Sequence, residues 1–379
     1  MTLVQARRSR PHRAVPRLLG ESGVFRSYWG AHTISLFGDQ VSLLAVPLVA
    51  VLTLDADAAE MGYLTALALA PNLLFALHAG AWVDRRGRRR QTMIATDVGR
   101  AAVLCTVPAA YALDVLTLGQ LYGVAFAVGA LTVLFGVSDA SLFVAIVPRE
   151  RYVEANSLLN GSRAFSFVAG PSMSGLLVQA LSAPGALLLD AFSFLGSGAL
   201  LARIHPDEPP PDPERDGVLV GLRWVARSSV VRATLLATAT INFFNFVFFA
   251  LFILYATRTL DVSPATLGLV LGAGAVGGLV GAAVTGRVTR RIGVGPALIV
   301  GCVLFTAPLV LVPLAAGSEA VVLACLFLAE FGSGLGVMLL DISAGSIFAA
   351  VIRRQPPSII RRCSTPRSSN PSNRMGNRA

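Results

Sequence analysis

The chain has 379 residues, of which 54% are hydrophobic and only 14% are charged, and its mean hydropathy is +0.68. Soluble domains carry about 25% charged residues, so this composition excludes a water-exposed globule, a disordered chain and a coiled coil. The net charge of +10 comes from 31 basic residues, all of them arginine. Because the arginines lie in short clusters between long apolar runs, they indicate a membrane protein rather than one that binds nucleic acid.

Ten apolar runs are long enough to cross a bilayer, which takes about 20 residues of helix. Barrel strands would alternate polar and apolar residues, and these runs do not, so we expect an all-α integral membrane protein with ten transmembrane helices. The expected spans cover residues 28–53, 61–82, 92–113, 119–147, 158–181, 184–203, 231–256, 264–288, 295–316 and 319–352.

The runs fall into two groups separated by a polar, proline-rich stretch. We expect a basic cytoplasmic tail at 1–27, a six-helix bundle at 28–203, a cytoplasmic linker at 204–230, an incomplete four-helix bundle at 231–352 and a basic, disordered tail at 353–379. The linker opens with a stiff, solvated run of Pro, Asp and Glu that cannot cross a membrane.

Arginines occur in alternate loops, and cytoplasmic loops are the ones enriched in basic residues. The arginine-rich segments are the N-terminal tail and the loops at 85–90, 149–151 and 287–291, whereas the loops at 55–60 and 317–319 are acidic or poor in arginine. The alternation predicts a multi-pass protein of the cell membrane with both termini in the cytoplasm.

The second group of spans repeats the first. A shift of 206 residues aligns Thr53-Leu54-Asp55 with Thr259-Leu260-Asp261, Gly80 with Gly286, and Gly87 with Gly293. Two parallel pseudo-repeats of this kind are typical of secondary carriers, whose substrate site lies between the halves. Because the second repeat has four spans rather than six, and the residues after Arg354 turn abruptly polar, we expect a truncated or frameshifted product; a genuine ten-span protein is the alternative.

One loop carries a family signature. Gly80-Ala81-Trp82-Val83-Asp84-Arg85-Arg86-Gly87-Arg88-Arg89-Arg90 fits the pattern G-x-x-x-D-R-x-G-R-R-R and resembles the signature loop of the major facilitator superfamily. The resemblance implies a fold of two parallel repeats with twelve helices, of which ten are seen here. It also implies a conformational latch formed by Gly80, Asp84, Arg85, Gly87, Arg88 and Arg89. The alternative is a basic anchor at the membrane surface with a chance Asp.

The fifth span resembles an export motif. Gly170-Pro171-Ser172-Met173-Ser174-Gly175 is similar to the G-P-x-x-G-G pattern of drug exporters in this superfamily, apart from Ser174. The first and sixth spans also resemble the enterobactin and macrolide exporter branch. Small residues at this spacing form a groove for a neighbouring helix, so ordinary packing of Gly170, Pro171 and Gly175 is the alternative interpretation.

Ionisable residues inside spans are costly and therefore tend to be functional. Asp39 and Glu330 lie near mid-depth, and we take them as candidates for proton coupling; a permanent pairing with arginine is the alternative. Asp97 and Arg100 lie one helical turn apart and are expected to form a cytoplasmic charge network. Further polar residues in the spans are Asp139, Arg163, Asp190, Asn242, Asn245, His32 and His78, of which the two histidines are expected to be packed or interfacial.

These features together predict a secondary active transporter that exports small amphipathic compounds by alternating access, driven by protons. The alternatives are a truncated, inactive remnant and an uptake carrier of the same fold. The sequence holds neither a Walker loop nor a G-x-S-x-G elbow, and its four cysteines lack metal-ligand spacing, so we expect no enzyme activity, cofactor or metal. The expected partners are a small-molecule substrate, protons and the lipid bilayer, without nucleic acid, and the chain is expected to be a monomer.

Overall fold

The structure, a computed structural model, describes residues 17–206 and 229–353, and every regular element in these ranges is helical. Ten of the described helices are long and apolar enough to cross a membrane, which confirms the ten predicted spans. Most of the expected tails and linker (1–27, 204–230 and 353–379) lies outside the described residues.

The spans follow a short helix, α1 (Arg17–Glu21), and within residues 17–206 and 229–353 they are connected by short turns. The first six are α2 (Gly23–Thr53), α3 (Ala58–Arg86), α4 (Arg89–Ala112), α5 (Leu118–Ile146), α6 (Tyr152–Leu181) and α7 (Ala183–Ala202). The last four are α9 (Ser229–Arg258), α10 (Pro264–Ile292), the segment α11 (Val294–Thr306) with its continuation α12 (Leu311–Leu314), and α13 (Glu319–Arg353).

Local sequence chemistry sets where these helices begin and break. Helix α2 begins before its apolar run because the Ser22 side chain caps it, accepting a hydrogen bond from the amide of Phe25. Between α11 and α12 the chain tightens into a 3-10 turn, Ala307–Val310, which contains Pro308. Proline lacks the amide hydrogen that a continuous α-helix requires, which explains the break.

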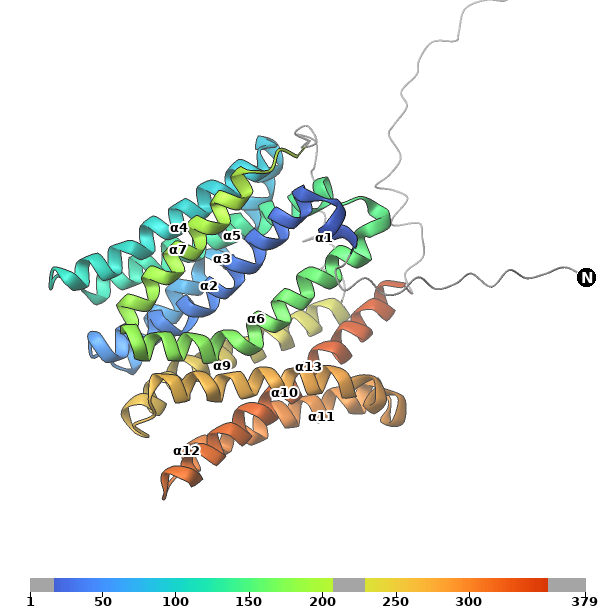
Figure 1. Cartoon of the computed structure of the whole chain (residues 1–379). Helices are drawn as coiled ribbons and strands as arrows, with labels where there is room; N and C mark the ends of the chain where they lie inside the picture. Colours follow the sequence, from blue (N-terminus) through green and yellow to red (C-terminus); the bar gives the residue numbers. More distant parts are fainter. Residues whose placement is uncertain (1–16, 207–228, 354–379) are drawn as a thin grey trace, which may run out of the picture.

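Consecutive spans run in opposite directions, so the turns gather at two ends. We name as the arginine-rich end the one that holds the turns after α3, α5 and α10, at residues 87–88, 147–151 and 293. The opposite end holds the turns after α2, α4, α6 and α9. Within the first six spans, α2 packs on α6 and α7, and α4 lies between α5 and α7; in the last four, α13 packs on α10 and α11 (Figure 1).

The backbone repeats as the sequence predicts. Asp55 and Asp261 follow α2 and α9 and adopt left-handed conformations with φ of 54° and 51°, and the next helix is capped by Asp57 in one repeat and by Ser263 in the other. The hydrogen bonds around these turns correspond one to one: Leu54 N to Val49 O and Ala56 N to Ala50 O, against Leu260 N to Tyr255 O and Val262 N to Ala256 O. The repeat therefore extends to individual backbone hydrogen bonds.

Two apolar clusters form the core. The larger draws on both groups of spans near the opposite end and joins Leu48 and Val178 to Phe252 and Leu267. The smaller lies nearer the arginine-rich end and draws only on residues 18–204. The apolar core shared by the two groups thus lies toward the opposite end, where α6 and α10 run side by side (Figure 1).

Candidate functional site

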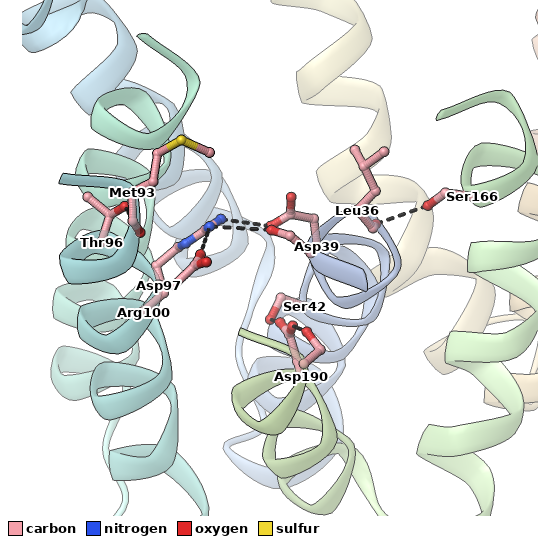
Figure 2. Close-up of polar contacts among 11 residues, drawn as sticks. Leu36, Asp39, Ser42, Met93, Thr96, Asp97, Arg100, Ser166 and Asp190 are labelled. Carbon is pink, nitrogen blue, oxygen red and sulfur yellow. Dashed lines mark hydrogen bonds and ion pairs between the residues drawn. The ribbon is translucent and has the colours of Figure 1, made fainter. Parts of the chain in front are cut away.

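The most highly connected charged side chain in the spans is Arg100 of α4. Its guanidinium donates to Asp97 one turn earlier on the same helix, to the Asp39 carboxylate of α2 at 3.2 Å and to the Ser35 hydroxyl at 3.3 Å. Figure 2 shows Arg100 reaching across from α4 to α2. The structure therefore places one cation between two carboxylates.

Aromatic rings hold this cation in an apolar setting. The Arg100 guanidinium carbon lies 4.5 Å from the ring centre of Phe135 and 4.0 Å from that of Phe194. A desolvated cation gains energy from the faces of such rings, and buried charges are tolerated where ion pairs satisfy them. Arg100 is fully buried, so its position is fixed by two rings and two carboxylates together.

The two carboxylates that share Arg100 differ in exposure. The Asp97 side chain is 0% exposed, whereas that of Asp39 is 39% exposed. The sequence predicts a charge network of Asp97 and Arg100; the structure pairs these two residues and adds Asp39 to them. Asp39 is consequently a solvent-accessible acid whose counter-ion already has a second partner.

A third carboxylate, from α7, packs against a position further along α2. Asp190 of α7 is buried and accepts hydrogen bonds from Ser42 of α2 and from Ser193, the latter at 3.0 Å (Figure 2). Gly38 makes this approach feasible, because a Cβ at that position would overlap both the Asp190 carboxylate and the Ser193 hydroxyl. The glycine lets α7 bring its carboxylate against the backbone of α2.

A third polar cluster lies toward the arginine-rich end of α2. The Tyr28 hydroxyl donates to Asp139 of α5 at 2.7 Å, and Nδ1 of His32 lies 3.5 Å from the other carboxylate oxygen of Asp139. Both Tyr28 and His32 are buried. Sequence reasoning assigns His32 to packing, although the spacing of Tyr28, His32, Ser35, Asp39 and Ser42 in steps of four, three, four and three is the signal of a shared helix face.

Glu330, the second candidate for proton coupling, has different surroundings. It lies on α13 against α10, and a Cβ at Gly274 would come within 3.0 Å of its carboxylate oxygen. In the part of the chain that the structure describes, Glu330 makes no hydrogen bond or ion pair. Asp39 and Glu330 are therefore not brought together, and only Asp39 has a charged partner among the described residues.

The arginine-rich loop that carries the family signature (residues 80–90) includes the end of α3, where a glycine adopts the left-handed conformation. Gly87 has a φ of 63° and its amide donates to the Val83 carbonyl, so a side chain there would be strained. At Gly80, the first residue of the expected latch, an added Cβ would meet no described atom within 4 Å. The side chain of Asp84 lies outside the described residues.

The arginines of this loop have different environments. Arg86 stacks over the Trp82 ring at 4.5 Å, Arg85 and Arg88 are exposed, and Arg89 is buried. Trp82, Arg86 and Arg88 line a cavity of about 440 Å³ between α3, α4 and α5. Its lining contains neither Asp39 nor Glu330.

The glycine-proline motif of α6 forms the contact with α10. A Cβ at Gly175 would overlap the carbonyl of Pro264, and one at Gly268 would overlap the carbonyl of Pro171. Glycines at these positions let the two backbones touch. Nearby polar contacts are Ser172 Oγ to Gly268 O at 3.4 Å, Gln179 Oε1 to Ala265 N at 3.2 Å, and Arg258 to both Asp55 and Val51 O at 3.3 Å.

These contacts between the two groups of spans share one location. Residues 171–179 end α6, residues 264–272 begin α10, and the bond from Arg258 reaches the turn after α2, all toward the opposite end. Gly170 contacts α2 rather than α10, because the Gln40 side chain of α2 packs where a Cβ of Gly170 would be. The described contacts thus join the two groups of spans at the end away from the arginine clusters.

Known sequences match most of the chain. The family described as Major Facilitator Superfamily matches residues 28–358. Relatives named "Multidrug efflux pump Tap" from Mycobacterium tuberculosis and Mycobacterium bovis are 28% identical over 285 residues. That alignment covers 69% of this chain and 66% of the relatives, slightly under two thirds of their length.

Solved structures share the fold at low identity. A nucleoside transporter, NupG, superposes with a TM-score of 0.67 at 14% identity, covering 89% of this chain and 84% of that one. A bacterial homologue of the lysosomal transporter Spinster, solved inward-facing and unoccupied, gives 0.64 at 14% identity over 87% and 78% of the two chains. A bacterial homologue of the iron transporter ferroportin, also inward-facing, gives 0.61 at 17% over 89% and 86%.

Proposed function

The chain belongs to the Major Facilitator Superfamily, and we propose that it is a proton-coupled exporter of small amphipathic compounds. Family membership makes it a multi-pass secondary transporter with a small-molecule substrate rather than an enzyme. The direction of transport and the class of cargo rest on the similarity to the multidrug efflux pumps and on the glycine-proline motif of α6.

The charge balance around Arg100 is the observation that carries proton coupling. With Asp39 and Asp97 both ionised, two negative charges face one positive charge. If Asp39 gains a proton, Asp97 still neutralises Arg100, so no buried charge is left without a partner. Asp39 can therefore bind and release a proton at modest cost, as a carboxylate that senses changing access must do.

Contacts between the helix groups support alternating access. We propose that the arginine-rich end faces the cytoplasm, in keeping with the distribution of arginine among the loops. The contacts at α6, α9 and α10 then close the outer side, and the molecule is open inward. On this proposal, Gly80, Asp84, Arg85, Gly87, Arg88 and Arg89 form the latch that engages in the outward-open state.

Aromatic residues on α9 support the proposed cargo. Phe243 and Phe244, at the middle of α9, are each 64% exposed, whereas Phe252 and Ile253, nearer the opposite end, are buried. A site between the helix groups that includes these rings would suit an amphipathic, partly aromatic compound. We propose that the transporter works as a monomer.

Ethidium accumulation tests this function. The 379-residue chain is expressed in cells that lack their own efflux pumps, and the dye is followed at two external pH values, with and without a protonophore. We expect less dye to accumulate than in cells without the protein, and the protonophore should bring accumulation back to the level of those cells. The reduction should be lost in Asp39→Asn but kept in Asp114→Asn, which alters an exposed turn. Unchanged accumulation would contradict transport of ethidium, and raised accumulation would favour uptake.

Cysteine labelling tests the orientation. After Cys105, Cys302, Cys325 and Cys363 have been replaced by serine, single cysteines are placed at Arg88 and at Asp114, which lie at the two ends of α4. A membrane-impermeant maleimide should label Asp114→Cys in whole cells and Arg88→Cys only after lysis. The reverse pattern would invert the proposed topology.

A further inference from the structure

A single face of α2 carries all three polar clusters described above. Tyr28 and His32 meet Asp139 of α5, Ser35 and Asp39 meet Arg100 of α4, and Ser42 meets Asp190 of α7. From Tyr28 to Ser42 is 14 residues, so the series extends about 21 Å along the helix. We name this series, with its partners Asp139, Arg100, Asp97 and Asp190, the α2 column.

We propose that the α2 column is the proton route of the transporter, with Asp139 and His32 exchanging protons toward the arginine-rich end and Asp190 toward the opposite end. Cargo moves elsewhere, between the two groups of spans. The inference deepens the proposed function, because it rests on proton coupling and names the residues that conduct it.

The pair of Asp139 and His32 is built to bind a proton. His32 is buried and neither ring nitrogen makes a hydrogen bond, although Nδ1 lies 3.5 Å from the Asp139 carboxylate. A protonated imidazole would be attracted to that carboxylate, while a neutral one leaves Asp139 with its bond from Tyr28. The other charged groups near this pair are Arg163 of α6, which lies close enough to act on Tyr28, and Asp39 of α2, which lies close enough to interact with His32.

Asp190 forms a matching site on the other side of Asp39. Its carboxylate accepts from two hydroxyls, Ser42 and Ser193, and each hydroxyl can instead accept a bond if the acid is protonated. The charged groups that influence it are Asp39 on α2 and Arg100 on α4. Asp190 therefore keeps hydrogen-bond partners in either protonation state.

The face of α2 that meets α6 is a different one. The Leu36 carbonyl accepts from Ser166 of α6 at 3.0 Å, and Gln40 packs against Gly170 of the same helix. Positions 36 and 40 lie one position beyond 35 and 39, so they are turned about 100° away from the column. Because α6 carries contacts to α10, the column is separated from the α6–α10 interface by the body of α2.

Each proposed step moves one proton between an oxygen or nitrogen of the column and water. An O–H bond of hydronium breaks and leaves water as an N–H bond forms on His32 or an O–H bond forms on a carboxylate, and the reverse step returns the proton to water as hydronium. Arg100 stays charged and positions Asp39, while Asp97 keeps Arg100 neutralised. No co-reactant other than water takes part.

Infrared spectroscopy tests the column without any cargo. The full chain in lipid nanodiscs is titrated while the carbonyl stretching band of protonated carboxyl groups is recorded. We expect Asp139→Asn and Asp190→Asn each to remove part of that band, and His32→Gln to shift the pH at which the Asp139 part appears. Asp114→Asn and His78→Gln, exposed residues of the same types, should leave the titration unchanged.

Proton and dye fluxes in proteoliposomes provide the second measurement. Asp139→Asn and Asp190→Asn should lose ethidium-driven proton movement but retain ethidium counterflow, and Asp139→Glu should recover part of the proton movement. Wild-type proton movement in both asparagine variants, or an unchanged carboxyl titration, would overturn the column. If wild-type protein moves no ethidium but its column still titrates with pH, the proposed cargo fails and the column stands.

Discussion

The interiors of the two helix groups are built in different ways. In the first, side chains from α2, α4, α5 and α7 meet in the α2 column, with Arg100 at its centre. In the second, α10 and α13 meet backbone to backbone: a Cβ at Gly277 would overlap the carbonyl of Phe331, and one at Gly281 that of Leu335. Glu330 is a carboxylate without a described ion pair within that glycine-lined contact.

The difference shows what a repeated fold preserves. The turns at Asp55 and Asp261 share dihedral angles and hydrogen bonds, since they fix how neighbouring spans connect. The side-chain contacts described inside the two groups differ, because a bilayer lets helices associate either through small residues or through polar bonds. Among the described residues, the first repeat is joined by charged side chains and the second by close helix contact, which favours the first as the place of the proposed proton binding.

The largest effect is expected at Arg100. The substitution Arg100→Met keeps much of the side-chain volume between Phe135 and Phe194 but leaves Asp97 buried without its cation. Removing one partner of a buried ion pair costs about 3–5 kcal/mol, so we expect a loss of that size in the free energy of unfolding. Unfolding by sodium dodecyl sulfate in mixed micelles, followed by tryptophan fluorescence, measures it.

A matched control separates the effect of losing a buried, paired arginine from the effect of losing any arginine. Arg203→Met alters an exposed arginine just after α7 and should leave the unfolding curve unchanged. The double variant Arg100→Met, Asp97→Asn should recover part of the stability, because it removes the unpaired charge. If Arg100→Met unfolds like the wild type, the column does not stabilise the first helix group, and the contrast with the second disappears.

A smaller effect is expected in the second helix group. The substitution Gly277→Ala inserts a methyl group against the Phe331 carbonyl, and overpacking of this kind typically costs about 1–3 kcal/mol. Gly136→Ala is the matched control, because a Cβ there meets no described atom within 4 Å and alanine favours helix. We expect the first variant to unfold earlier and the second later. Equal stability of the two variants would show that α10 and α13 can separate freely.

The sequence predicts the spans well because each lipid-embedded backbone group must be bonded within a helix, which makes long apolar runs unambiguous. It also predicts the repeat, since Asp55, Asp261, Gly87 and Gly293 mark turns whose geometry limits the residue choice. It does not predict which residues of different helices meet. Arg100 and Asp39 are 61 positions apart, and their contact depends on how α2 and α4 are rotated about their axes.

Helix rotation also decides the neighbours of single residues. His32 is buried, as expected for a packed residue, and its position four residues after Tyr28 also places it beside Asp139. Gly80 faces open space on its helix, because a Cβ there would meet no described atom within 4 Å. Hydropathy gives the depth of a residue in the membrane, whereas its neighbours follow from the face of the helix on which it lies.

The smallest effect is expected at Glu330, and its sign is the opposite of that at Arg100. Because no cation accompanies Glu330 in the described structure, Glu330→Gln removes a poorly solvated acid and breaks no ion pair. We expect the free energy of unfolding to rise by about 1 kcal/mol, while Asp97→Asn, which takes a carboxylate from Arg100, lowers it. Sodium dodecyl sulfate titrations of the two variants, compared with the wild type, make the comparison direct. A loss of stability in Glu330→Gln would reveal a partner for this carboxylate outside residues 17–206 and 229–353, and would give the second helix group a polar network of its own.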